Sequence, residues 1–440
     1  MFRMKWLCTV VSVCALAAQV HFHQSGFEPG GGGIPEGWRT WSPRAEIAPR
    51  TFVDTVRYRK QPGSLAISGN SNPAVFGGWV RTIPGIEAGK WYRFSACYRA
   101  EGTIYEPLQM WARLDWTDAA GKRAGQPEYA WRVEVEGDWK RISIEAPAPE
   151  KATAVNLELS LLNAPTATVY WDEIALDEIA APRERRVRLA ALNYMPRGTQ
   201  AAAESVRQFL EKIDESIPGK ADIILLPEGI TVVGTGKKYA DVAEPIPGPT
   251  TARLSEVAKR KQAYIAAGLY EREAQAIYNT AVLIDRSGKV AGKYRKVYIP
   301  REEMEGGITP GSDYPVFETD FGKVGLMICW DLQFADPARA LALRGAEILL
   351  VPIWGGNPAL GKARAIENQV FLVSSGYNYP TYVLDPTGET LAQAAEQGRA
   401  AIAEIDLNRR YIDPWLGDMR ARLRKELRLD LNAEPVVRQR

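Results

Sequence analysis

The sequence GKVGLMICWDLQF, residues 322–334, decides how the second half of this 440-residue chain is organised. Its apolar residues 324–328 predict a buried strand that ends at Cys329, and a helix is expected to begin near Asp336. A cysteine between a core strand and a turn has a rigid mount and an open side, which suits a nucleophile. A lone cysteine is more often a small buried hydrophobic residue, so the assignment depends on the rest of the chain.

Strand and helix patterns alternate on both sides of this stretch. Strands are expected at residues 187–193, 221–226, 264–270, 348–353, 371–376 and 400–405, and helices at 199–217, 251–262, 337–344 and near 362–368. Two hairpins are expected, turning at residues 287–288 and 386–388. The alternation predicts an α/β domain over residues 186–415. The arginine-rich tail, residues 416–440, is expected to be a solvated helix or arm.

Residues 25–180 follow a different pattern, with short alternating apolar runs separated by glycine, proline and asparagine. This predicts an all-β sandwich, joined to the α/β domain by the charged linker PRERR at residues 182–186. Most of its nine tryptophans are expected in the core, although Trp111, Trp116 and Trp131 are candidates for stacking on sugar rings. The sequences GSLAISG, AGKWYRFSACYRAEG and TVYWDEIAL resemble jelly-roll carbohydrate-binding modules, which makes a glycan one candidate ligand.

The first 18 residues predict an export signal. A positive start at Arg3 and Lys5 precedes an apolar run that is too short for a comfortable transmembrane helix, and small residues follow at 15–17. A secreted or periplasmic protein is therefore expected. Loss of the signal leaves Cys97 and Cys329, which is no disulfide framework, and a free thiol in an exported protein favours a reactive Cys329. The net charge of +2 gives no reason to expect a nucleic-acid partner.

The two histidines of the chain, His21 and His23, both lie next to the predicted cleavage site. Their absence from the rest of the chain excludes a Ser-His-Asp or Cys-His arrangement in the folded core. It also argues against a histidine-rich zinc site. If Cys329 is a nucleophile, its base must be a carboxylate or a lysine.

Three candidate groups stand at the ends of predicted strands: Glu228, Lys296 and Cys329. Side chains at strand ends converge on one rim of an α/β sheet. Each has a simpler interpretation alone, since Glu228 suits a turn or a helix cap and Lys296 suits a charged surface. Their joint occurrence in a chain whose body lacks histidine favours one catalytic site.

The sequences LLPEGI, GKYRKVYIPREEMEGGITPG and GLMICWDLQF, which contain these three residues, resemble motifs of the nitrilase, or carbon–nitrogen hydrolase, superfamily. The resemblance implies a four-layer α-β-β-α sandwich, a dimer or larger assembly, and a Glu-Lys-Cys triad without metal or organic cofactor. It also implies a supporting loop glutamate, for which Glu303 is favoured over Glu305. Tyr298 replaces a histidine that many members carry two residues after the lysine, which puts a packing contact in doubt.

These roles imply hydrolysis through a thioester on Cys329, with Lys296 and the Trp330 backbone N–H facing the oxyanion. The expected substrate is a small-molecule amide, nitrile or carbamoyl amide, in a pocket that includes Trp354, Asn357 and Tyr379. Two alternatives stay open. One is an N-acyltransferase that uses the same thioester, and the other is a non-catalytic glycan-binding protein.

Overall fold

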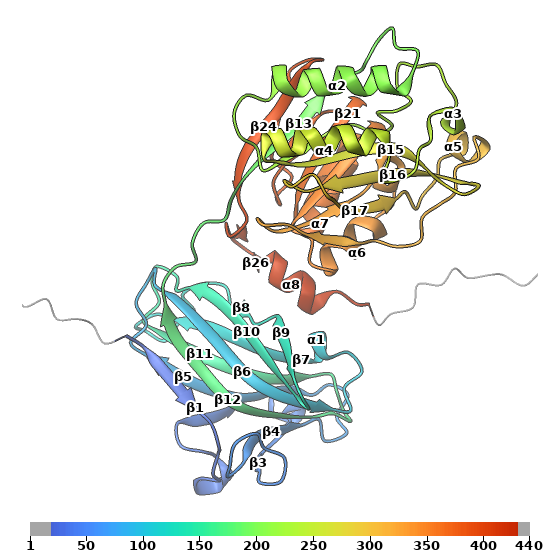
Figure 1. Ribbon diagram of the computed structural model, residues 1–440. Helices are drawn as coiled ribbons and strands as arrows, with labels where there is room; N and C mark the ends of the chain where they lie inside the picture. Colours follow the sequence, from blue (N-terminus) through green and yellow to red (C-terminus); the bar gives the residue numbers. More distant parts are fainter. Residues whose placement is uncertain (1–18, 430–440) are drawn as a thin grey trace, which may run out of the picture. The chain divides into compact units, whose positions relative to one another are not determined.

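The computed structural model describes residues 19–429, which form two compact units (Figure 1). The first contains the residues before Pro182 together with those from Asp413 onward, and the second is Pro182–Ile412. The predicted export signal lies outside the described residues. No helix in residues 19–429 is long and apolar enough to span a bilayer.

The first unit consists of two antiparallel sheets. The larger has the order β3-β4-β12-β6-β10-β9, with β1 also beside β12. Its strands are β1 His21–Gln24, β3 Arg50–Asp54, β4 Ser64–Ser68, β6 Trp91–Glu101, β9 Arg132–Glu136, β10 Trp139–Pro147 and β12 Thr168–Ile179. The smaller sheet is β2 Trp38–Trp41, β5 Phe76–Pro84, β11 Ala154–Leu162, β7 Met110–Thr117 and β8 Glu128–Tyr129. One apolar core lies between them. The unit is therefore a β-sandwich, and the jelly-roll description stays a prediction.

The tryptophans of this unit are mostly core residues. Trp79, Trp116 and Trp171 are fully buried. The suggestion that Trp116 stacks on a sugar ring is therefore wrong, because its indole lies inside the sandwich. Trp131 is half-buried, and the guanidinium of Arg424 lies 4.8 Å from its ring centroid.

The C-terminal segment differs from the predicted solvated arm. Helix α8, Met419–Glu426, belongs to the first unit, where Ala421 and Lys425 are buried. Lys425 Nζ donates to the carbonyl of Met110 at 2.8 Å. The arginine-rich composition gave no sign of this packing, since long basic side chains can bury their aliphatic carbons while their charged groups stay in water. The α/β unit accordingly ends at Ile412, and residues 430–440 lie outside the described part.

The second unit contains two six-stranded sheets. One has the order β17-β16-β15-β14-β13-β24 and the other β18-β19-β20-β21-β22-β23. The strands of the first are β13 Arg186–Asn193, β14 Ile223–Leu225, β15 Tyr264–Glu273, β16 Ala276–Ile284, β17 Val290–Arg295 and β24 Arg399–Asp406. The strands of the second are β18 Val316–Glu318, β19 Lys323–Leu326, β20 Ile348–Gly355, β21 Phe371–Asn378, β22 Tyr382–Leu384 and β23 Thr390–Gln393. Three central strands of each sheet are parallel, and antiparallel strands flank them.

Three of the apolar clusters in this unit join its layers. One joins the facing sides of the two sheets, with residues such as Leu225 and Leu326. The second packs helices α2 Ala202–Ser216 and α4 Pro249–Lys261 on the other side of the first sheet. The third packs helices α6 Asp336–Leu343 and α7 Pro358–Asn368 on the other side of the second sheet. Strands β14 and β19 therefore belong to two sheets that face each other across one apolar core.

Candidate active site

Cys329 stands on a rigid turn just after β19. It has a positive φ of 42° and begins a short 3-10 helix, Cys329–Gln333. A non-glycine residue in this conformation is strained unless its surroundings hold it. The buried Asp331 carboxylate provides that hold, since it accepts from Ile328 N at 2.9 Å, Tyr298 N at 2.9 Å and Tyr294 Oη at 2.7 Å. Burial raises the Asp331 pKa to about 6, although these donors oppose the rise.

Lys296 follows β17 and is almost completely buried between two carboxylates. Its Nζ lies 2.9 Å from Glu228 Oε1 and 2.8 Å from Glu303 Oε2. The amide of Asn279 bridges the same carboxylates, donating to Glu228 at 2.7 Å and to Glu303 at 2.6 Å. Tyr270 Oη adds a bond of 3.2 Å to Glu303. The four-sided network fixes the ammonium and both carboxylates in one geometry.

The charges in this network set the protonation states. Burial disfavours the Lys296 ammonium, but Glu228, Cys329 and Glu303 outweigh it and raise its pKa, so Lys296 stays charged. Burial raises the pKa of Glu303, and the ammonium opposes that rise. Burial and the Glu228 charge raise the pKa of Cys329 to about 12, while Lys296 acts in the opposite direction. The sulfur is therefore a neutral thiol near pH 7 and needs a proton acceptor.

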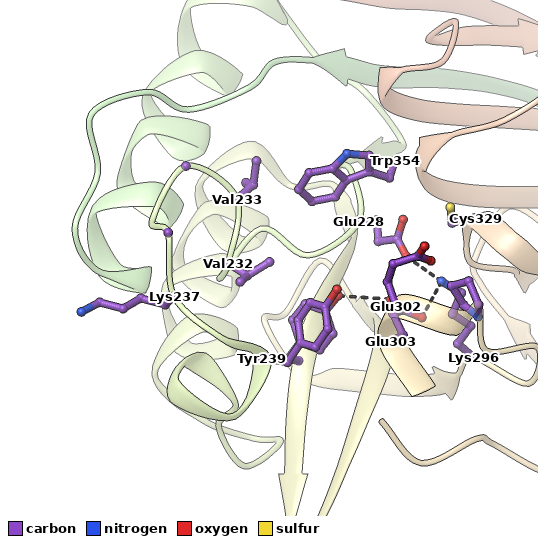
Figure 2. A pocket seen from close by; sticks show the side chains of 14 residues that line it. Glu228, Val232, Val233, Lys237, Tyr239, Lys296, Glu302, Glu303, Cys329 and Trp354 are labelled. Carbon is purple, nitrogen blue, oxygen red and sulfur yellow. Dashed lines mark hydrogen bonds and ion pairs between the residues drawn. The ribbon is translucent and has the colours of Figure 1, made fainter. Parts of the chain in front are cut away.

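Glu228 keeps one carboxylate oxygen unpaired within residues 19–429. Its Oε1 is bonded to Lys296 and Asn279, whereas its buried Oε2 has no hydrogen-bond partner among the described residues. Its backbone is clamped as well, because Tyr377 Oη donates to the Glu228 carbonyl at 2.8 Å. A Cβ on Gly268 would come within 2.7 Å of Glu228 Cα, so only glycine lets β15 pass this closely. Figure 2 shows the carboxylate on the same side of the cavity as the Cys329 sulfur.

A cavity of about 510 Å³ opens above these groups. Its wall combines the candidate catalytic residues with apolar and aromatic side chains (Figure 2): Glu228, Val232, Val233, Gly234, Gly236, Lys237, Tyr239, Tyr270, Lys296, Pro300, Glu302, Glu303, Cys329 and Trp354. Glu228, Lys296, Glu303, Cys329 and Trp354, all expected from the sequence, thus share one cavity.

Other expected site residues lie elsewhere. Glu305 is exposed on helix α5, Arg301–Glu305. Asn357 caps helix α7, where its side chain accepts from Ala359 N at 3.0 Å. Tyr379 is buried, and its hydroxyl lies 2.6 Å from that of Tyr382. Neither Asn357 nor Tyr379 belongs to the cavity wall among the described residues. Trp330 directly follows Cys329 and is 41% exposed.

Sequence reasoning missed the groups that hold the site together. Asn279, Tyr270 and Tyr377 all lie inside strands that read as apolar runs. A fully buried asparagine within AIYNTAVLI was a usable signal, because buried amides need partners and the neighbouring strand ends carry carboxylates. Asp331 had a similar signal, since it directly follows the predicted nucleophile and its neighbour.

Known proteins resemble the part of the chain that contains this cavity. A family model described as carbon–nitrogen hydrolase matches residues 186–412. The omega-amidase NIT2 of Homo sapiens is 32% identical over 236 residues, which covers 47% of this chain and 84% of that protein. A probable nitrilase of Schizosaccharomyces pombe is 32% identical over 226 residues, covering 47% and 82%. The chain belongs to the carbon–nitrogen hydrolase family and is an enzyme that hydrolyses carbon–nitrogen bonds.

Solved structures resemble about half of the chain. A carbon–nitrogen hydrolase from Helicobacter pylori G27 aligns with a TM-score of 0.43 and 23% identity, over 51% of this chain and 90% of the other. An amidase from Nesterenkonia sp. aligns with a TM-score of 0.45 and 21% identity, over 52% and 93%.

Proposed function

We propose that this enzyme is an amidase in which Cys329 is the nucleophile, Glu228 the general acid and base, and Lys296 the oxyanion-stabilising cation. The observation that supports it most strongly is the buried Lys296 ammonium, bonded to two carboxylates in the cavity that contains Cys329. A buried charge of this kind is costly unless it is paired, and such perturbed groups gather at functional sites.

The first half of the reaction forms a thioester. Glu228 takes the thiol proton as Cys329 Sγ bonds to the amide carbon, and charge builds on the substrate oxygen. The Lys296 ammonium and the Trp330 backbone N–H stabilise that charge. Glu228 then gives the proton to the nitrogen as the C–N bond breaks, so ammonia or an amine leaves.

The second half releases the acid. Glu228 takes a proton from water, whose oxygen attacks the thioester carbon. The C–S bond breaks and the proton returns to sulfur, which restores the starting enzyme. Glu303 does not touch the reacting atoms in this scheme. It positions Lys296 and helps to keep the ammonium charged, while Asn279 holds the Glu303 carboxylate in place.

The cavity favours a small, electrically neutral acyl group. Val232, Val233 and Trp354 supply an apolar wall, and Lys237 is the one cation besides Lys296 among its described lining residues. Figure 2 shows the Lys237 side chain directed away from the cavity. We therefore expect simple aliphatic or aromatic amides to be better substrates than amides that carry a second carboxylate. Nitriles and carbamoyl amides are the competing substrate classes.

We further propose that residues 1–18 are an exported enzyme's cleaved signal, that the enzyme is a homodimer or larger, and that the β-sandwich is a jelly-roll that binds glycan. The first rests on the charge and apolar pattern of the N-terminus. The second rests on the superfamily resemblance alone. The third rests on the sandwich architecture and on Trp111, whose half-buried side chain leaves it a candidate for stacking on a sugar ring.

Ammonia release from matched amides, nitriles and carbamoyl compounds tests the proposed activity. Cys329→Ala should abolish release without lowering the melting temperature by more than a few degrees. Cys97→Ala is the matched control, since Cys97 is the other free thiol among the described residues and lies in the first unit. Full activity in Cys329→Ala, or equal loss in both variants, would contradict the assignment. Release from nitriles alone would replace the amidase assignment by a nitrilase.

A further inference from the structure

The two histidines of the chain come together on the surface of the β-sandwich. His21 and His23 lie two residues apart on β1, so their side chains share one face of the sheet. The alternate residue Phe22 packs toward the sandwich core with Val20, which leaves both imidazoles on the outer face. This pairing was not expected from their position beside the predicted cleavage site.

A carboxylate stands opposite them. In the antiparallel register of β1 and β12, His21 pairs directly with Asp177. Asp177 Oδ1 lies 2.8 Å from His21 Nδ1 and 2.6 Å from His23 Nε2. The three potential ligand atoms lie within 4.8 Å of one another. It is the one such group of histidine, cysteine and acidic residues within residues 19–429.

The surroundings do not oppose a cation. Arg93, next to Asp177 across β6, is paired with Glu145 at 2.8 Å. Lys90 is paired with Glu178 at 3.2 Å. Both imidazoles are more than half exposed, so an ion and its remaining water ligands can reach them without moving the backbone.

We propose that His21, His23 and Asp177 bind one divalent first-row transition-metal ion of the Zn²⁺ class. Two imidazole nitrogens and one carboxylate oxygen are ligands that such ions accept, and water would complete the coordination shell. On binding, each ring keeps its proton on the nitrogen that faces solvent, and the ion takes the place of the two contacts to Asp177. Because β1 pairs with β12 alone, the ion would fasten the first described strand to the sandwich. The three ligands belong to the first unit, whereas Cys329 belongs to the second, and the proposed hydrolysis does not use the ion.

Imidazole nuclear magnetic resonance tests the proposal directly, since the chain has only two histidines. Untagged protein without residues 1–18, and therefore without Cys8 and Cys14, is prepared with Cys329→Ser to remove a further competing thiol, labelled in its histidine rings and titrated with Zn²⁺. We expect both ring signals to shift together and to saturate at one equivalent. Rings that do not respond, or that saturate at different zinc concentrations, would overturn the proposal.

Two carboxamide variants on the same strand provide the matched comparison. Asp177→Asn should weaken zinc binding at least about tenfold, since even loss of a second-shell partner commonly costs 10–100-fold. Glu178→Gln, whose side chain pairs with Lys90, should bind as tightly as the parent. Unchanged affinity in Asp177→Asn, with the rings still dispersed as in the folded parent, would exclude the three-ligand site. If Asp177→Asn unfolds, His21→Asn supplies the same comparison through the remaining His23 signal.

Discussion

Glu228→Gln separates the two effects that this carboxylate has on Cys329. As a negative charge, Glu228 raises the thiol pKa, whereas as the proposed general base it would remove the thiol proton during catalysis. The glutamine keeps the shape and can still accept a hydrogen bond from Lys296. The substitution removes the negative charge, so that charge no longer opposes the effect of the Lys296 ammonium, which lowers the Cys329 pKa. We therefore expect a variant whose thiol is more ionised and whose turnover is nevertheless lost.

The size of both effects can be worked out. The Cys329 pKa is about 12, so each unit of decrease raises the thiolate population about tenfold near neutral pH. Intrinsic nucleophilicity falls about threefold per unit, which leaves a net gain of roughly three- to fourfold per unit in alkylation rate. Loss of the general base should lower kcat/KM by about 10²–10⁴.

The assay compares iodoacetamide labelling of Cys329, followed by peptide mass spectrometry, with ammonia release on one amide. Glu305→Gln is the control, because Glu305 is exposed on α5 and is not a cavity residue. It should change neither rate by more than about twofold, in line with the small effect of surface substitutions. Slower labelling in Glu228→Gln, or near-normal turnover, would refute the reasoning.

Three further predictions follow from the same contacts. Lys296→Ala should lower kcat/KM by an amount equivalent to about 3–4 kcal/mol, because a group that stabilises the oxyanion is lost. Lys296→Arg should not restore kcat/KM, because the planar guanidinium cannot take the place of the compact ammonium. Near-normal kcat/KM in Lys296→Arg would contradict this prediction. The Asp331 pKa is higher in the folded than in the unfolded protein, so between pH 4 and 6 the folded protein binds a proton that the unfolded protein has lost. The free energy of unfolding, measured by urea titration, should therefore fall by ~3 kcal/mol as pH rises through that range, relative to the same measurement on Asp331→Asn. An equal pH dependence in both proteins would be inconsistent with the raised pKa. A truncated chain of residues 182–412 should fold and keep the kcat/KM of the whole protein on a small amide. A large loss of kcat/KM in a truncated chain that still melts cooperatively would assign part of the site to the β-sandwich.

Sequence patterns placed the catalytic candidates because those residues follow strands whose apolar runs are unmistakable. Glu228 and Cys329 each come three residues after a short buried strand, at Leu225 and Leu326. The strands belong to different sheets, although convergence on one rim of a single sheet was the stated reason. The conclusion survived because the two sheets face each other across one core, so their strand ends still meet.

Patterning did not show which partners the remaining candidate residues and the C-terminal helix would take. Asn357 directly precedes a helix and became its cap, which local sequence favours for asparagine. Tyr379 turned into the core toward Tyr382. The arginine-rich C-terminal helix was predicted to be solvated. Instead, Lys425 in this helix donates a hydrogen bond to Met110, which lies 315 residues earlier in the sequence. Periodicity carries no information about such partners.

The direct test of the central claim is to trap the acyl group on Cys329. The enzyme is mixed with its best amide, quenched in acid within the first turnover, and analysed by intact mass and peptide mapping. The account predicts a mass gain equal to the amide minus ammonia, located on the Cys329 peptide, with about one equivalent of ammonia released first. The gain should be absent in Cys329→Ala and present in Cys97→Ala. Ammonia release at the full rate by Cys329→Ala, or an acyl group found on another residue, would contradict the account.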